Sequence, residues 1–488
     1  MIRLKISNTE TQRHGKKQPS IIRQNLWLAG CKQLWMWLCN FLLLFSVPPC
    51  LRVSSLKQSL SVMCLLCGLL DAQQALAVPR LLTLEDCLAI ASDKNLDIQK
   101  AREYANYVQG RYVEERAAAL PQLGLQAGFG YSKDNSTKAL YGSAQLQNSR
   151  TVDLSLSQPL YTWGKIGAAL RAAEVGLKTA DQQLRLFRQA AFRDVSIAFY
   201  DVLLAKELHR LAQENLAQKE RHHTEAKRKF EAGVATDYDL LAAEVELQNA
   251  RPELIRAENS IRISRERLRF LLGADQEELD VVGRMEARLE QGTGFDESLR
   301  IALDKRPELA DQKLRIGINQ ELITIANADD KPRLDLKGSA GWHQLELSNP
   351  GPTRRSDGPA WNAGVYLTFP FFDGLRSRGR TQQARSELRT SQLQEQKLRD
   401  SIALELRSAH YRLTEAGEII TALSGTVKQA ERLLQMAEKG FEYGVKTRLE
   451  VDDAQTNLLR AQSNLARANR DYLSAQVNLQ WAMGVAGE

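Results

Sequence analysis

Helical periodicity covers most of the chain, and the longest run that carries it is 166–230. This run contains no proline, and an apolar stripe crosses its middle at steps of one, three and four residues, through Val195, Ala198, Phe199, Val202 and Leu203. Such spacing places side chains on one face of a helix. At ~1.5 Å per residue, a single helix over this run would be on the order of 100 Å long.

A different helical pattern follows Gly233 and Gly444. From 240 to 268 and from 451 to 479, small and apolar residues recur at alternating steps of three and four. This spacing is the seam of a coiled coil, and one layer of each seam is almost all alanine, which lets a partner helix approach closely. The pattern predicts antiparallel coiled-coil pairs and by itself says nothing about chemistry.

Four segments instead alternate apolar and polar residues with a period of two, at 123–131, 152–157, 334–342 and 365–371. They predict two hairpins with one apolar face, each strand near the ~9–11 residues that cross a membrane. Aromatic residues lie at or near the predicted strand ends, where a membrane interface favours them: Tyr131, Tyr161, Trp163, Trp342 and Trp361. Alternation alone fits two hairpins on a soluble core equally well.

The whole pattern occurs twice. Residues 88–273 align without a gap on residues 299–484, and a unit of this length lies far outside the ~20–50 residues of a solenoid repeat. Two tandem copies favour a pseudo-symmetric ring or tube over an enzyme with one cleft. We therefore divide the chain into an N-terminal extension with a signal peptide, a first repeat, a linker and a second repeat, at 1–77, 78–273, 274–294 and 295–488.

The formal net charge of +7 comes from residues 1–77, and the repeated body is neutral, so the charge gives no support for nucleic-acid binding. Lys57, the apolar run 60–70 and the small residues that end at Ala77 match the three regions of a secretory signal. We expect cleavage after Ala77. An earlier apolar run at 26–47 is an alternative anchor, but we favour an over-extended start, and no cysteine lies in a convincing lipobox.

Enzyme motifs are absent from the sequence after Ala77. It has no P-loop, HExxH, GxSxG or CxxC pattern, and Cys87 is its one cysteine, so no internal disulfide can form. His222 and His223 are neighbours on a predicted helix and point ~100° apart, so they cannot bind one metal from one face. We expect both histidines to be solvated, and we predict no catalytic residue, no metal site and no cofactor. The protein is therefore not expected to be an enzyme.

Short motifs in a fixed order carry a family resemblance. They are Leu-Thr-Leu-Glu at 82–85, Arg-Pro-Glu-Leu at 306–309, and Phe-Glu-x-Gly-Val-x-Thr, which occurs at both 230–236 and 441–447. With the signal peptide and the tandem strand–strand–helix–helix units, this set resembles the outer-membrane efflux proteins, the TolC-like channels. The resemblance covers about 82–485.

This resemblance implies a mainly helical protein with a membrane β-barrel part in the outer membrane of a Gram-negative bacterium. Such proteins are homotrimers, in which four strands per chain complete a twelve-stranded barrel and long coiled-coil helices form a periplasmic α-barrel. Strand edges exposed to lipid are not tolerated, so several chains must close one sheet. The implied function is a passive exit duct for efflux or type I secretion.

The implied partners are outer-membrane lipid, a periplasmic adaptor of the membrane fusion protein class, and an inner-membrane RND or ABC transporter. The hairpin connections 132–151 and 343–362 would face outside the cell. A periplasmic coiled-coil scaffold without a pore is the alternative function, and the cargo stays open between drugs, metal ions and proteins.

The resemblance also assigns roles near the two glycine turns. It implies an adaptor-docking tip at Gly233 and Gly444, although each glycine also fits a simple helix stop with positive φ. Position by position, it implies a periplasmic gate formed by polar residues of all three chains: Asp239, Lys446, Glu450 and Asp453. Tyr238 and Phe441 belong to the same region, and Phe441 lacks the hydroxyl of the family tyrosine.

A simpler explanation competes for two of these gate residues. Thr236 with Asp239, and Thr447 with Glu450, have the spacing of helix capping boxes. Asp453 lies too far into its helix for capping. Threefold symmetry would place three Asp453 carboxylates around one axis, which predicts a constriction that attracts cations.

Overall fold

The computed structural model describes residues 80–487 except 137, 139–143, 275–278, 290–292 and 349–351. The predicted signal peptide and its cleavage site at Ala77 lie outside these residues. Within the described part, no helix is both long enough and apolar enough to cross a membrane. The protein is mainly helical, and its helices and strands follow the order in which the sequence pattern predicts them.

The first half of the chain contains two short helices, two strands and two long helices. They are α3 (Leu84–Lys94), α4 (Leu96–Ala117), β2 (Gln122–Asp134), β3 (Gln145–Tyr161), α6 (Lys165–Glu231) and α7 (Asp237–Leu272). The second half contains α8 (Phe295–Lys305), α9 (Pro307–Asn327), β5 (Arg333–Ser348), β6 (Arg354–Thr368), α10 (Arg376–Glu442) and α11 (Arg448–Ala482). Two three-residue strands, β1 (Arg80–Leu82) and β4 (Leu279–Val281), pair in parallel.

Local chemistry explains where the shorter helices begin and end. The Asn95 side chain accepts hydrogen bonds from the backbone N–H groups of Asp97 and Ile98, so it caps α4 directly after α3 ends. In the second half, Pro307 occupies the first position of α9, where a missing N–H costs nothing. Pro121 and Pro332 follow α4 and α9, so the chain leaves the helical layer and enters the sheet.

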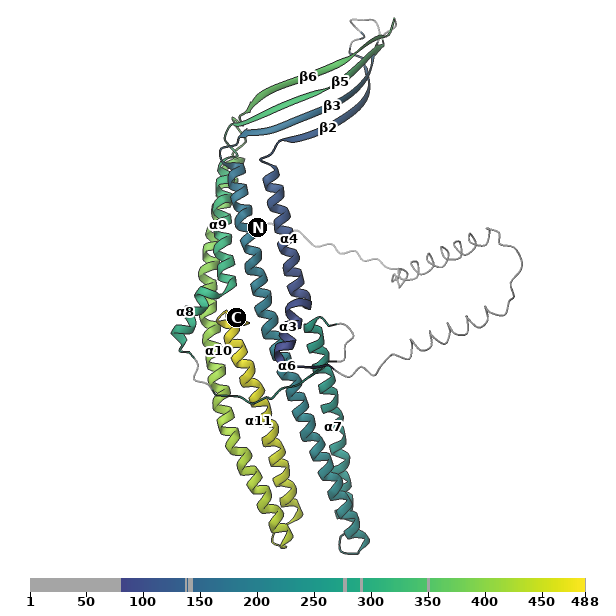
Figure 1. The fold of residues 1–488 in the computed structure, drawn as a ribbon, viewed down its shortest axis with the longest axis vertical. Coiled ribbons are helices and arrows are strands. Elements are labelled where there is room, and N and C mark those ends of the chain that lie inside the picture. The colour runs from purple at the N-terminus through teal and green to yellow at the C-terminus, as the bar shows by residue number, and fades with distance from the viewer. Residues whose placement is uncertain are drawn as a thin grey trace, which may run out of the picture. The chain divides into compact units, whose positions relative to one another are not determined.

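The two 67-residue helices, α6 and α10, run the length of the helical part (Figure 1). At ~1.5 Å per residue each is about 100 Å long. Near the sheet, α4 packs on α6, and α9 packs on both α6 and α10; away from the sheet, α7 packs on α6 and α11 on α10. The contact between α6 and α11 joins the two long hairpins, α6–α7 and α10–α11.

The main core lies at mid-height, around β1, β4 and the upper end of α7. Its largest fully buried members include Leu82, Val202, Leu268 and Leu272. Cys87 is also in this core, and burial raises the pKa of its thiol to about 11. Smaller clusters continue down the α10–α11 hairpin and contain several alanines, as the coiled-coil seam predicts.

The four long strands form one antiparallel sheet in the order β2-β3-β5-β6, so β2 and β6 are its open edges. The strands contain 13, 17, 16 and 15 residues, and the predicted length of about 9–11 is wrong. The predicted loops 132–151 and 343–362 are correspondingly too long, because strand pairing continues beyond the apolar band, for example between Asp134 and Gln145. Backbone hydrogen bonds need no apolar side chain.

Candidate functional site

Each long hairpin turns through a glycine with a left-handed backbone. Gly233 has φ 72° and Gly444 has φ 70°. The Gly233 and Val234 N–H groups donate to the carbonyls of Phe230 and Lys229, at 2.9 Å each, and Gly444 and Val445 make the equivalent bonds. This pair of bonds is the Schellman motif, which satisfies the last carbonyls of a helix. Both glycines are therefore helix stops, whatever else they do.

A capping box begins the returning helix of each hairpin. The Thr236 side chain accepts from the Asp239 N–H while the Asp239 carboxylate accepts from the Thr236 N–H, and Thr447 and Glu450 repeat the arrangement. Hydrogen bonds from Thr236 hold the pKa of Asp239 below its usual range. The Lys446 ammonium and the Thr447 N–H lower the pKa of Glu450 to about 2. In the single chain, both carboxylates are thus engaged as caps.

The remaining two predicted gate residues differ in their surroundings. Lys446 makes an ion pair with Glu450, with 2.5 Å between Nζ and Oε1. Asp453 is exposed and makes no hydrogen bond or ion pair with any described residue. The structure thus brings Lys446 together with Glu450, leaves Asp453 free, and places Asp239 on the other hairpin.

Asp452, the neighbour of Asp453, joins the two hairpins. Its carboxylate lies 3.5 Å from Lys219 Nζ and 3.5 Å from His222 Nδ1, both on α6, and 3.4 Å from Arg448 Nε on α11. Lys219 also donates to Glu246 of α7 at 2.8 Å. Lys219 and Asp452 keep only 12% and 15% of their side-chain surface exposed. We call these five side chains the inter-hairpin cluster.

The expectation that His222 is solvated is wrong. Its side chain is 17% exposed, and its Nδ1 and the facing Asp452 Oδ1 are buried atoms without a hydrogen-bond partner among the described residues. The sequence carried one usable signal: Lys219 and His222 are three residues apart and therefore share a face of α6. The partner Asp452 is distant in sequence, so the cluster itself was not predictable.

Phe441 lies between cations of both hairpins. The Lys229 ammonium of α6 is 5.4 Å from the centre of its ring, and the Arg448 guanidinium is 5.7 Å from it. These distances suit cation–π attraction, which needs a ring face and no hydroxyl. A phenylalanine at this position therefore still connects the hairpins.

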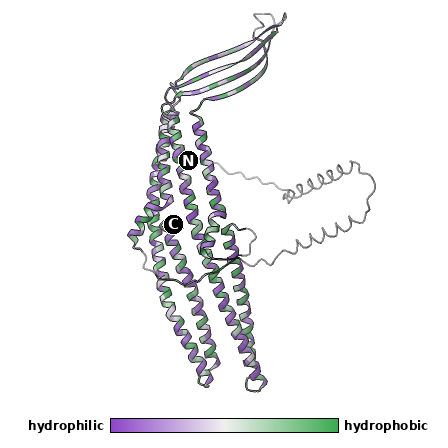
Figure 2. Cartoon of the chain, viewed as in Figure 1, coloured by the Kyte–Doolittle hydropathy of each residue, from purple (hydrophilic) through white to green (hydrophobic). Residues whose placement is uncertain are grey.

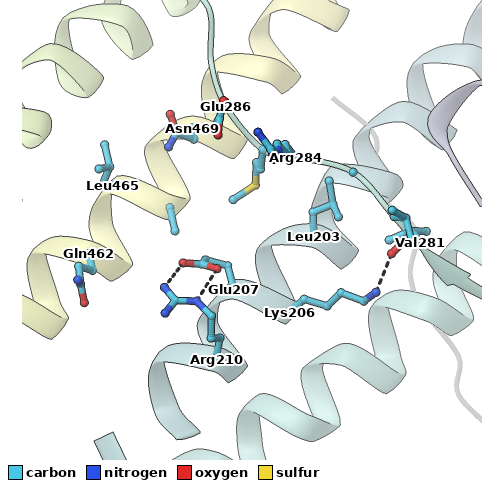
Figure 3. Close-up of a pocket in the computed structure, with 14 residues that line it drawn as sticks. Leu203, Lys206, Glu207, Arg210, Val281, Arg284, Glu286, Gln462, Leu465 and Asn469 are labelled. Atoms are coloured by element: carbon cyan, nitrogen blue, oxygen red, sulfur yellow. Dashed lines mark hydrogen bonds and ion pairs between the residues drawn. The ribbon is translucent and has the colours of Figure 1, made fainter. Parts of the chain in front are cut away.

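A cavity of about 730 Å³ opens between α6, α11 and the segment that follows β4 (Figure 3). Lys206 donates to the Val281 carbonyl at 2.7 Å and so ties this segment to α6. Arg210 is occupied by Glu207 and Glu214, which raise the pKa of its guanidinium. No nucleophile–base pair lines this cavity, and no group of three His, Cys, Asp or Glu side chains among the described residues is placed to hold a metal.

Apolar and polar residues alternate along the strands, so the sheet has two different faces (Figure 2). Register places Leu125, Leu154, Ala340 and Trp361 side by side across one face, and most apolar residues of this face are at least half exposed. We call it the apolar sheet face. Trp361 lies in the middle of β6, so its expected position near a strand end is wrong.

The opposite face of the sheet is polar and rich in small residues. Its register row contains Gly128, Thr151, His343 and Gly358, and His343 Nε2 lies 2.8 Å from Asp153 Oδ1. A sheet with one apolar and one polar face suits a boundary between lipid and water.

A sequence model of the outer membrane efflux protein family matches residues 88–274 and again 299–485. The chain belongs to the outer membrane efflux protein family. This family consists of channel proteins rather than enzymes, and the protein is an outer-membrane efflux or secretion channel with a large helical periplasmic part.

Individual relatives agree with this assignment. The outer membrane protein TolC of Vibrio cholerae is 26% identical over 381 residues, which cover 77% of this chain and 84% of the relative. The alkaline protease secretion protein AprF of Pseudomonas aeruginosa is 26% identical, covering 76% and 78%. The crystal structure of the Campylobacter jejuni outer membrane channel CmeC has the same fold, with a TM-score of 0.70 and 17% identity over 83% of this chain and 86% of that chain.

Proposed function

We propose that three copies of this chain form one outer-membrane pore that continues as a periplasmic tunnel. One observation carries the proposal: a four-stranded sheet has one exposed apolar face and two unpaired edges, β2 and β6. In hydrocarbon, every backbone polar group needs a partner, so β2 of one chain must pair with β6 of the next. Three copies then give a closed twelve-stranded barrel whose polar face lines the lumen.

The helices extend this pore into the periplasm. We propose that the repeats at 78–273 and 295–488, joined by the linker 274–294, act as two quasi-equivalent units in each chain. Three chains then supply six long hairpin-forming helices, three of the α6 type and three of the α10 type, around one axis. Residues 1–77 are removed with the signal peptide.

The hairpin tips are the proposed docking site for a periplasmic adaptor of the membrane fusion protein class. Val234 and Val445, next to the turn glycines, leave 78% and 79% of their surface exposed. An exposed apolar residue at the end of a long rigid hairpin suits contact with another protein. The adaptor in turn couples the channel to an inner-membrane RND or ABC transporter, which supplies the energy for transport.

The same end of the tunnel holds the proposed gate. Asp453 keeps a free carboxylate, so three copies around the axis would attract cations. Asp239, Lys446 and Glu450 contribute charge close to it, in addition to their local roles. The inter-hairpin cluster holds the α10–α11 hairpin against α6 and so sets the closed position.

Single-channel recording in a planar bilayer tests this function. Purified mature protein that migrates as a heat-modifiable trimer should open discrete pores. A folded protein that inserts into membranes and opens no pore, or one that stays soluble without detergent, would favour the periplasmic scaffold instead. The cargo follows from which substrates accumulate in cells that lack the protein.

A further inference from the structure

Two residues at the junction of sheet and helices have an unusual backbone. Among the described residues, Trp163 and Leu375 are the non-glycine residues with positive φ, at 51° and 67°. Each lies beside a left-handed glycine, Gly164 or Gly374, directly before a 67-residue helix. The left-handed backbone conformation is unfavourable for any residue with a Cβ atom, and a second glycine at either position would relieve the strain. Strained positions of this kind commonly mark a function of the side chain.

Both strained side chains belong to an exposed apolar surface. We define the junction patch as the apolar residues around the starts of α6 and α10: Tyr161, Trp163, Phe369, Phe371, Phe372 and Leu375. Phe371 and Phe372 leave 89% and 79% of their surface exposed. The starts of α6 and α10 adjoin the base of the sheet (Figure 1). Tyr161 pairs with Leu334, which pairs with Leu367, so Tyr161 lies on the apolar sheet face.

Two exposed cations, Arg376 and Arg378, lie at the start of α10 beside the patch. Arg378 forms no ion pair or hydrogen bond with any described residue, and Arg376 is attracted by the nearby Asp373 carboxylate without forming a direct ion pair with it. The nearby Lys165 and Arg380 differ, because both bind the carboxylate of Asp329, at 2.6 and 2.8 Å. Cations in the first turn of a helix also oppose its dipole, so Arg376 and Arg378 gain little from their own helix.

We propose that the junction patch inserts into the periplasmic leaflet of the outer membrane and that Arg376 and Arg378 bind the phosphate of an anionic phospholipid there. Amphipathic aromatic side chains favour the interface between hydrocarbon and headgroups. Guanidinium groups bind phosphate with strong, charge-assisted hydrogen bonds. This inference rests on the proposed membrane position of the sheet and adds a defined lipid contact to it. The binding site is asymmetric, because the first repeat has Lys165, already paired, and Gly167 at the equivalent positions.

The headgroup contact is tested by native mass spectrometry of the mature protein with phosphatidylglycerol and with phosphatidylcholine. Each arginine near an anionic lipid contributes about a fivefold preference, so Arg376→Gln with Arg378→Gln should lower phosphatidylglycerol binding by about 10- to 30-fold and leave phosphatidylcholine binding unchanged. Arg432→Gln, an exposed arginine far down α10, is the matched control. Equal phosphatidylglycerol binding by the double variant and the control would overturn the headgroup assignment.

Insertion of the patch is tested separately by tryptophan fluorescence in bilayers of brominated phosphatidylcholine. Two variants each keep one of the four tryptophans of the mature chain, Trp163 or Trp361, and carry phenylalanine at the others. Bromine near the headgroup should quench Trp163 most, and bromine deep in the acyl chain should quench Trp361 most.

The two tryptophans separate the possible failures. If Trp361 is quenched and Trp163 is not, the sheet lies in the membrane but the junction patch is covered by a neighbouring chain, and the inference is wrong. If neither is quenched, the sheet is outside the bilayer and the proposed function fails as well.

Discussion

Replacement of Asp452 by asparagine should favour opening of the proposed gate at the hairpin tips. Asp452 is the carboxylate through which α11 contacts Lys219 and His222 of α6. At about 4 Å and an effective dielectric constant near 20, opposite unit charges attract by about 4 kcal/mol, but most of this is offset by desolvation. Lys219 and Asp452 are 12% and 15% exposed, so we take a net stabilisation of about 1 kcal/mol per chain from this ion pair. This value lies near the upper end of the range for solvent-exposed ion pairs.

Concerted opening multiplies this effect. If all three chains of the proposed trimer open together, about 3 kcal/mol is removed from the closed state, which raises the ratio of open to closed channels by about 100-fold. Single-channel recording of the mature protein measures this ratio directly. Lys219→Met should have a similar effect, and the double variant should add little, because each change removes the same contact.

Asp453→Asn is the matched control. Its carboxylate is exposed and makes no contact with a described residue, so the change should not raise the open probability, and it should reduce block by divalent cations. Equal open probabilities for Asp452→Asn and wild type would refute the role of the inter-hairpin cluster. Additive effects of the Asp452 and Lys219 changes would show that the two side chains act separately.

Three further predictions follow from local geometry. Gly444→Val should destabilise the hairpin tip by about 1 kcal/mol or more through backbone strain alone, since no atom lies within 4 Å of an added Cβ. If the folded variant binds the adaptor as well as the wild type does, Gly444 has no role in docking. Gly341→Ala should block formation of the heat-modifiable trimer, because its Cβ would lie 2.2 Å from the Val152 carbonyl oxygen, whereas Gly358→Ala has open space and should assemble normally. The pKa of Glu450 falls from 4.5 to about 2 on folding, so the capping box at the start of α11 stabilises the helix fully above about pH 4.5 and less as the pH drops toward 2. A spin label in the first turn of α11 should gain mobility over that pH window. Glu450→Gln should abolish this pH dependence.

The sequence predicted the helices well because their signals are local. The proline-free run 166–230 lies within the helix Lys165–Glu231, and the coiled-coil seam 240–268 lies within the helix Asp237–Leu272. The capping boxes were equally predictable, since Thr236 and Asp239 are only three residues apart. In each case the determining contacts lie within one helical turn.

Strand ends and charge clusters were less predictable because their partners are distant in sequence. Pairing carries the strands past the last apolar residue, so the alternation of side chains underestimates their length. The position of Asp453 after the glycine turn made it a predicted gate residue, but its neighbour Asp452 makes the half-buried contacts to α6. The packing of α6 on α11 determines which of the two adjacent carboxylates faces the other hairpin. No local sequence pattern predicts this packing.

A cryo-electron microscopy map of the mature protein in lipid nanodiscs tests the proposed trimeric pore most directly. We predict three chains, with β2 of each chain paired with β6 of its neighbour in one closed barrel within the lipid, and a continuous passage into a helical tunnel. A different number of chains, or a sheet whose edges remain unpaired outside the lipid, would contradict this prediction.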